Sequence, residues 1–352
     1  MVSQLNEAFL DDLAKIGPIG KTLSMLVRPA FVAAPGKRLV WGDWSAIEAR
    51  VLPWLAASPS AEKVLDIFRE SDHDKSKPDI YMRTACDLIG EDAVDWWDAY
   101  RGNQGEARKI AAGELRQSRG KVPVLSLGFG GGLGALQAMA INYGVFLDDA
   151  KAQEVVERWR ATNPWARQFW GKHDRDGSSG LWGAANRALE NPGDAFAAGR
   201  VAYVYDPGYL GGTLFCALPC GRLLSYPDIR YRTRTFKDKT TQEDVEKHAL
   251  WFKKGYGWSA LWFGKLAENV TQAVAGSILR ETLVELEDHD PRWETIGSTH
   301  DEVVLECSEQ DDAVAAARQE LEHVMGEWRP DWRKDLPLVA EVTDHGWYSK
   351  AV

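Results

Sequence analysis

The chain has 352 residues, 45% of them hydrophobic, which is enough for a substantial core in one large domain or two or three subdomains. Its formal net charge of -10 excludes a globally basic surface, so a nucleic-acid partner would need a local basic groove. The cysteines lack the paired spacing of a zinc site. No apolar stretch reaches bilayer length and the N-terminus lacks a signal-peptide layout, so we expect a cytoplasmic protein without a membrane partner.

The N-terminal third predicts a strand followed mainly by helices. An apolar run at 39–41 predicts a short strand, and the spacing of apolar residues from 46 to 55 predicts a helix. Ser45 and Glu48 have the spacing of a capping box at the start of that helix. Residues 60–118 predict further helices separated by polar loops, and Pro123 predicts that the next helix begins close to residue 121.

The remaining two thirds predict helices first and strands later. A helical pattern at 148–170 is interrupted at Asn163 and Pro164, and residues 205–245 carry turn signals and a basic stretch, RYRTRTFKDKT, expected on the surface. A helix is predicted at about 258–287, and "ETIGSTHDEVVLEC" has the pattern of a β-hairpin. A helix at about 309–328 and a strand in "LPLVAEV" follow. Strands near both ends of the chain can therefore share one sheet.

Two aspartates occupy the ends of predicted strands. Asp43 follows the first strand and Asp301 lies at the tip of the hairpin. Aspartate is common at such positions for structural reasons alone. If the two strands are neighbours, however, both carboxylates meet at one edge of the sheet, where they could bind Mg²⁺ for phosphoryl transfer. A nuclease or a nucleotidyltransferase could use such a pair.

Several motifs narrow this choice. "DWSAIEARVL", "RQSRGKVPVLSLGFGG" and "STHDEVVLE" resemble motifs A, B and C of family A DNA polymerases, the group of bacterial DNA polymerase I, in order and approximate spacing. "DIYMRTA", "LPCGRLLSY", "ENVTQAVA" and "HGWYSK" resemble further segments of the family, most closely of its phage members. The resemblance runs from about residue 28 to the C-terminus.

The resemblance implies an α/β (α+β) fold. It would combine an antiparallel palm sheet with helices and a mostly helical fingers subdomain, without a thumb or exonuclease domain. The expected parts are an N-terminal helical or connecting segment at 1–27, the first part of the palm at 28–60, mainly fingers at 61–205, and the second part of the palm at 206–352.

The resemblance also implies the roles of individual residues. Asp43 and Asp301 match the aspartates that bind two Mg²⁺ ions, for which Mn²⁺ can substitute, and Glu302 matches a supporting catalytic acid. Lys121 matches the motif B lysine that meets the incoming triphosphate, and Glu48 the glutamate under its sugar. Residues that match primer and template contacts are His300, Gln272, Asn269 and Arg222.

Motif B departs from the family pattern at several positions. Its arginine is expected four residues before Lys121, where Gln117 stands, so either Arg116 or Arg119 could replace it. The remaining nucleotide-site matches are Leu125 in place of an aromatic residue, Phe129 in place of a tyrosine, and Tyr81 where many relatives have a histidine that contacts phosphate.

The implied function is template-directed addition of deoxynucleotides to a primer, with primer-template DNA and dNTPs as partners, in a bacterial or phage-infected cell. Because only 42 residues precede Asp43, the chain would be a minimal polymerase, a fragment, or dependent on a separate protein that bears a thumb or exonuclease. Apolar residues at nearly helical spacing could dock such a protein or pack on the palm: Leu5, Phe9, Leu10 and Leu13. The alternatives are a non-catalytic, polymerase-like DNA-binding subunit and a single-subunit RNA polymerase, which Glu48 disfavours.

Overall fold

The computed structural model describes residues 15, 17, 19–171, 179–237, 244–287 and 292–349. The predicted N-terminal helix through Leu5 and Leu13 lies outside these residues. The chain divides into two compact units. The first unit contains residues up to Ser45, Ile278–Arg329 and the segment from Leu338 onward, and the second contains Ala46–Ser277 and Pro330–Pro337.

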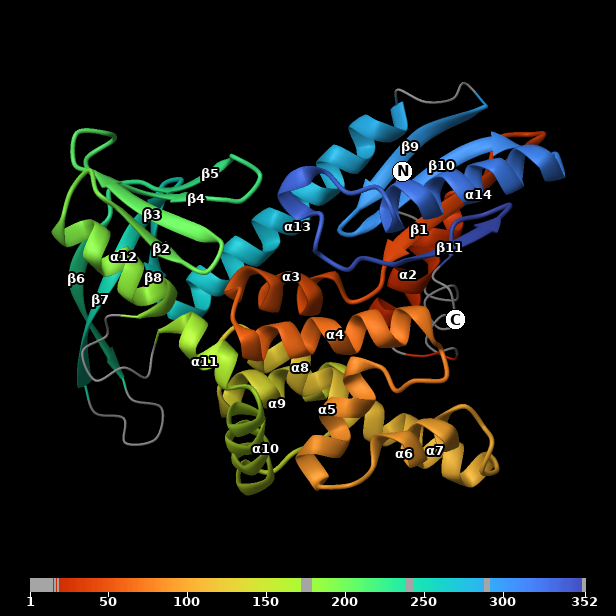
Figure 1. Ribbon diagram of the computed structural model, residues 1–352, viewed down its shortest axis with the longest axis horizontal. Helices are drawn as coiled ribbons and strands as arrows, with labels where there is room; N and C mark the ends of the chain where they lie inside the picture. Colours follow the sequence, from red (N-terminus) through yellow and green to blue (C-terminus); the bar gives the residue numbers. More distant parts are fainter. Residues whose placement is uncertain are drawn as a thin grey trace. The chain divides into compact units, whose positions relative to one another are not determined.

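An antiparallel sheet from both ends of the sequence forms the centre of the first unit (Figure 1). Its strand order is β11 (Ala340–His345), β1 (Lys37–Trp44), β10 (Glu302–Ser308) and β9 (Trp293–Thr299). Strand β1 pairs with β10 from Lys37 to Asp43 and with β11 from Leu39 onward. The prediction that strands near the two ends of the chain share one sheet is therefore confirmed.

Helix α14 (Asp311–Gly326) packs closely on one face of this sheet (Figure 1). A Cβ atom at Gly42 would lie 2.6 Å from the Met325 sulfur and 3.2 Å from a Leu321 methyl carbon, so glycine permits this approach. The Trp44 indole nitrogen donates a hydrogen bond of 2.8 Å to the Met325 carbonyl. Since side chains alternate along a strand, Asp43 belongs to the other face.

That other face has a small aromatic core. Leu39, Trp41, Val304 and Tyr348 form one buried cluster, in which the Trp41 and Tyr348 rings meet edge to face at 5.4 Å. Short helical segments precede β1 in the same unit, namely α2 (Ile19–Val27) and a 3₁₀ turn at Arg28–Ala30. The cluster anchors the C-terminal segment that carries Tyr348 against β1.

Helices dominate the first part of the second unit. They are α3 (Ile47–Ala56), α4 (Pro59–His73), α5 (Ile80–Ile89), α6 (Ala93–Tyr100), α7 (Glu106–Leu115), α8 (Val122–Leu127), α9 (Leu133–Asn142), α10 (Asp149–Thr162), α11 (Pro164–Trp170) and α12 (Gly180–Glu190). The predicted interruption at Asn163 and Pro164 separates α10 from α11. A π-helix at Arg116–Lys121 connects α7 to α8, so the chain is already helical before Pro123.

Two antiparallel sheets complete the second unit. One contains β2 (Ala195–Ala198), β3 (Val201–Asp206), β4 (Thr213–Ala217) and β5 (Leu223–Tyr226), and the other contains β6 (Arg230–Lys237), β7 (Asp244–Lys254) and β8 (Gly257–Leu261). The long helix α13 (Phe263–Glu287) follows. The prediction of a helix from residue 258 was wrong for its first residues, because 257–261 pair with β7.

The predicted capping box at the start of α3 does not form. Ala46, not Ser45, precedes the helix, with a left-handed φ of 54° and without a side-chain capping bond. The Ser45 backbone N–H instead donates to the Val339 carbonyl at 2.9 Å. The Glu48 carboxylate accepts a hydrogen bond from Gln272.

The fold is thus a mixture of helices and antiparallel sheets, as the sequence predicted at this level. The four cysteines are free thiols, and burial raises the pKa of the Cys86 thiol to about 11. Among the described residues, no helix is both long enough and apolar enough to cross a bilayer.

Candidate active site

The two predicted aspartates lie side by side at one edge of the first unit's sheet. The register of β1 and β10 places Asp43 opposite Glu302, the residue after Asp301. The Trp44 backbone N–H donates to the Asp301 carbonyl at 3.3 Å. Both aspartates are half-buried, and the exposed His300 turns the hairpin with a left-handed φ of 57°. The predicted proximity of the two strand ends is therefore present in the structure.

Glu302 is bound on both of its carboxylate oxygens. Arg28 Nη1 donates to one oxygen at 2.6 Å, and the Tyr348 hydroxyl donates to the other. The Arg28 guanidinium also lies 4.9 Å from the centre of the Tyr348 ring. The hydrogen bond to Glu302 raises the pKa of Arg28, while burial and the bond to Glu302 raise the pKa of Tyr348. Sequence reasoning missed Arg28 and Tyr348, although "HGWYSK" contains the tyrosine.

The carboxylates of Asp43 and Asp301 are the candidate metal ligands at this edge. Glu341 is paired with Asp43 on the side away from Glu302 and is exposed. In the part of the chain that the structure describes, no group of three or more His, Cys, Asp or Glu side chains is arranged to hold a metal. Mg²⁺ commonly binds through one or two carboxylates together with substrate phosphates. Asp43 and Asp301 fit that requirement.

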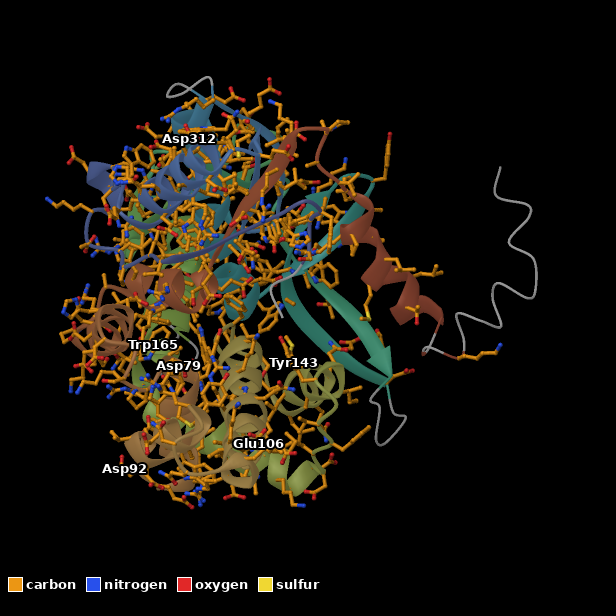
Figure 2. All side chains as sticks on the ribbon, turned by 90° about the vertical axis from the view of Figure 1, so that its right-hand side faces the viewer. Asp79, Asp92, Glu106, Tyr143, Trp165 and Asp312 are labelled. Carbon is orange, nitrogen blue, oxygen red and sulfur yellow. The ribbon has the colours of Figure 1, made fainter. Side chains whose placement is uncertain are left out.

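The second unit brings Lys121 and Arg116 to the same aromatic ring. Lys121 Nζ lies 6.0 Å from the centre of the Tyr81 ring and 5.6 Å from that of Tyr143, and the Arg116 guanidinium lies 5.0 Å from Tyr81. Burial raises the pKa of Tyr81 to about 12, so its hydroxyl stays protonated near neutral pH. Arg116 Nε donates to Asp79 at 2.8 Å. Figure 2 labels Asp79 and Tyr143, the partners of this segment.

The π-helix explains why Arg116, rather than Gln117, accompanies Lys121. The Val122 N–H bonds to the Gln117 carbonyl, five residues back, whereas an α-helix would bond four residues back. Residues five apart therefore share a face here, and Arg116 lies five residues before Lys121. A Cβ atom at Gly120 would lie 2.0 Å from the Tyr81 carbonyl oxygen, so glycine lets this turn pack against α5.

Arg119 differs from Arg116 in its contacts. Arg116 is held by Asp79 through both Nε and Nη2. Arg119 is half-buried and has no hydrogen bond or ion pair with any described residue. Of the two arginines that the sequence left as alternatives, Arg116 is thus positioned by Asp79, and Arg119 has no hydrogen bond or ion pair with a described residue.

Glu48, Leu125 and Phe129 line one apolar pocket of the second unit. Gln272, from α13, donates a hydrogen bond to the Glu48 carboxylate. Phe129, where the motif resemblance predicts a tyrosine, has no hydroxyl, and the Gln272 amide contacts the Glu48 carboxylate. Sequence reasoning placed Gln272 against DNA and did not foresee this bond.

Two of the other three predicted DNA contacts, Asn269 and Arg222, also have partners within the second unit. Asn269 donates to the Tyr226 hydroxyl at 3.2 Å, and Arg222 Nη1 donates to the Ser277 hydroxyl at 2.7 Å. Both residues are half-buried. Their present bonds fix β5 and the preceding loop against α13, and each side chain would need to share or exchange a bond to reach a nucleic acid.

Comparison with known proteins agrees with these features. No family model matches the sequence. A DNA polymerase, however, is 32% identical to this chain over 338 residues, which is 94% of the chain. Over most of its length the chain is therefore similar to a DNA polymerase, which agrees with the resemblance of its motifs.

That relative is the DNA polymerase of Bacillus phage SP02, and the chain spans 44% of its length. Among solved structures, the POL domain of Pol1 from M. smegmatis, in complex with a DNA primer-template and dNTP, aligns with 91% of this chain and 42% of its own. The two share 18% sequence identity, and the TM-score is 0.48.

Proposed function

We propose that this chain is a template-directed DNA polymerase that adds deoxynucleotides to a primer 3′ end. The observation that carries the proposal is the pairing of β1 with β10, which places Asp43 and Asp301 at one sheet edge in a homologue of a phage DNA polymerase. A nuclease could use the same pair of carboxylates. The cations of the second unit and its pocket lined by Glu48 favour nucleotide addition instead.

Asp43 and Asp301 are the residues that would hold Mg²⁺ or Mn²⁺. When bound, the ions supply activation of the primer 3′-hydroxyl and neutralise charge on the departing pyrophosphate. The protein's contribution is to keep two carboxylates at fixed positions on hydrogen-bonded strands. Glu302 supports this arrangement because Arg28 and Tyr348 hold it opposite Asp43.

The second unit would bind the incoming dNTP. Lys121, Arg116 and Arg119 provide positive charge for the triphosphate, with Arg116 oriented by Asp79. Tyr81 supplies the aromatic surface on which Lys121 and Arg116 rest. Arg116 already binds one carboxylate, so Arg119 is the arginine that would contribute more to the interaction with phosphate.

Glu48 would select the sugar. Its carboxylate lines the pocket with Leu125 and Phe129, so a ribose 2′-hydroxyl would meet both bulk and negative charge there. The bond from Gln272 keeps the carboxylate in one orientation. Selection against ribonucleotides therefore depends on the pair of residues rather than on Glu48 alone.

Primer extension tests the proposal against its alternatives. The purified chain is mixed with a labelled primer-template and Mg²⁺, with either dNTPs or rNTPs. We expect template-dependent extension with dNTPs. Extension with rNTPs would identify an RNA polymerase, DNA binding without extension would identify a non-catalytic subunit, and primer shortening would identify a nuclease.

A further inference from the structure

A second tyrosine accompanies Lys121 in the second unit. Lys121 Nζ lies 5.6 Å from the centre of the Tyr143 ring and 6.0 Å from that of the Tyr81 ring. Tyr81 belongs to α5, whereas Tyr143 is the residue that follows α9 (Figure 2). Burial is the main cause of the raised pKa of Tyr81, and the nearby Tyr143 phenol adds to it. The Lys121 ammonium is therefore within reach of two rings that come from separate elements.

The backbone at Tyr143 is fixed by a tight turn at the end of α9. The Val145 N–H donates to the Ala140 carbonyl at 2.9 Å. The Gly144 N–H donates to the Ile141 carbonyl at 3.0 Å, and Gly144 has a left-handed φ of 72°. These two bonds and the left-handed glycine form a Schellman motif, which is a common end of a helix. The turn therefore keeps Tyr143 at a defined place in the fold.

Gln117 connects this turn to the π-helix. Its side-chain amide donates a hydrogen bond of 3.1 Å to the Tyr143 carbonyl. Gln117 stands where the motif B resemblance predicts an arginine, and it belongs to the same π-helix as Lys121. The bond therefore fixes Tyr143 relative to the segment that carries the lysine.

A lysine gains more from such support than an arginine does. Its ammonium is a single charge on a flexible four-carbon stem, so binding to a phosphate restricts many rotamers. An aromatic ring within about 6 Å attracts the ammonium and restricts it without neutralising its charge. Tyr81 and Tyr143 therefore limit the positions of the Lys121 charge before a phosphate binds.

We propose that Tyr143 is a positioning residue for the incoming triphosphate, that it acts through Lys121, and that Gln117 holds it in place. This role rests on the proposed function, because it assigns Lys121 to the triphosphate. It explains how a glutamine can stand at the motif B arginine position, since its amide holds the aromatic partner of the lysine. The ring of Tyr143, and not its hydroxyl, is the part that acts on the ammonium.

Single-nucleotide incorporation over a range of dNTP concentrations tests this role. We expect Tyr143→Leu to weaken the apparent dNTP affinity about threefold, with a nearly parental rate at saturating dNTP, because the ammonium keeps its charge. Tyr143→Phe keeps the ring and should restore most of the affinity. Gln117→Met removes the amide at nearly constant size and should cause a smaller loss than Tyr143→Leu. Tyr256→Leu is the matched control, because Tyr256 is fully exposed in the turn between β7 and β8.

A combined variant shows whether the effect passes through Lys121. In the Lys121→Ala background, Tyr143→Leu should cause no further loss of dNTP affinity. An equal loss in both backgrounds would overturn the inference, because Tyr143 would then act on the nucleotide directly or on the fold. Unchanged affinity in Tyr143→Leu would also overturn it, and an equal loss in Tyr143→Phe would assign the effect to the hydroxyl instead of the ring. Thermal unfolding checks that each variant folds.

Binding of inorganic triphosphate separates this inference from the polymerase proposal. Calorimetric titration of the whole chain, without DNA, requires only the groups that bind phosphate. We expect Tyr143→Leu and Lys121→Ala to bind triphosphate more weakly than the parent, and Tyr143→Phe to bind it nearly as well. These differences without any primer extension would refute the polymerase proposal alone. Equal triphosphate binding by the parent and Tyr143→Leu would refute the positioning role even in an active polymerase.

Discussion

Asp43 and Asp301 are neighbours because β1 and β10 are hydrogen-bonded strands, whereas Arg116 and Lys121 share a face because one helical segment is a π-helix. A strand has a side-chain period of two, so a single inserted residue would move Asp43 to the α14 face. A helix can accommodate an additional residue as a π-bulge and keep its flanking turns in place. The sheet edge therefore depends on strict spacing, and the helical region tolerates a change in spacing.

The largest effect is expected at the sheet edge. Asp43→Asn preserves shape but removes a charged oxygen ligand, so we expect nucleotide addition to fall by about a thousandfold or more. Asp312→Asn is a matched control, because Asp312 is an exposed aspartate in the first turn of α14 (Figure 2). Thermal unfolding checks that both variants fold. Near-parental extension by Asp43→Asn would refute the assignment of Asp43 as a metal ligand.

A smaller effect is expected on sugar selection in the helical region. Glu48→Ala should raise incorporation of ribonucleotides relative to deoxynucleotides by about tenfold or more, because bulk and charge are lost where a 2′-hydroxyl would lie. Gln272→Ala should produce part of that change by releasing the carboxylate. The double variant should resemble Glu48→Ala, since both residues act through one group.

The rNTP/dNTP incorporation ratio of each variant measures this coupling. If Gln272→Ala weakened primer-template binding and left the rNTP/dNTP incorporation ratio unchanged, Gln272 would be a DNA contact rather than a partner of Glu48. Additive changes in the ratio would mean that the two residues act independently.

The hydrogen bonds that hold Glu302 at the sheet edge should contribute mainly to the stability of the fold. Glu302→Gln removes the charge that Arg28 and Tyr348 bind, and we expect a loss of about 2 kcal/mol in the free energy of unfolding. The nearby Glu309→Gln is a control, because Glu309 is exposed. Urea unfolding of the three proteins measures the difference. Equal stability of Glu302→Gln and Glu309→Gln would show that the buried contacts contribute little.

The smallest effect is expected for a deletion in the π-helix. Removing Ser118 leaves Arg116 four residues before Lys121, the spacing of an ordinary α-helix. We expect the free energy of unfolding to change by less than about 1 kcal/mol, because the deletion removes only the extra residue of a π-bulge. The dNTP affinity should stay nearly parental. Deleting Gln153 from the regular helix α10 should be more damaging, since it rotates the buried Val155 and Trp159 out of register. Equal damage from both deletions would contradict this account of the π-helix.

Much of the sheet edge could be predicted from the sequence. The apolar run before Asp43 and the hairpin pattern around Asp301 are local signals, and the motif order implied that the strands meet. The contacts of Glu302 could not be predicted in this way. Arg28 is 274 residues away in sequence, so only the folded chain brings the two side chains together.

The helical region was predicted less well for a physical reason. The sequence showed that Gln117, and not an arginine, stands four residues before Lys121. The sequence alone, however, does not distinguish an α-helical turn from a π-helical turn. The Ser45 and Glu48 spacing was misleading, because the left-handed Ala46 separates Ser45 from the helix that it was expected to cap. Residues 257–261 form a strand because β7 supplies backbone partners, which overrides any local helical preference.

The most direct test separates the chemical step from nucleotide binding. Single-nucleotide incorporation by the parent, Asp301→Asn and Lys121→Ala is followed over a range of dNTP concentrations. We expect Asp301→Asn to lower the rate at saturating dNTP by about a thousandfold with little change in apparent dNTP affinity. Lys121→Ala should weaken dNTP affinity by about tenfold or more. A parental saturating rate in Asp301→Asn would contradict the central claim that the sheet edge performs nucleotide addition.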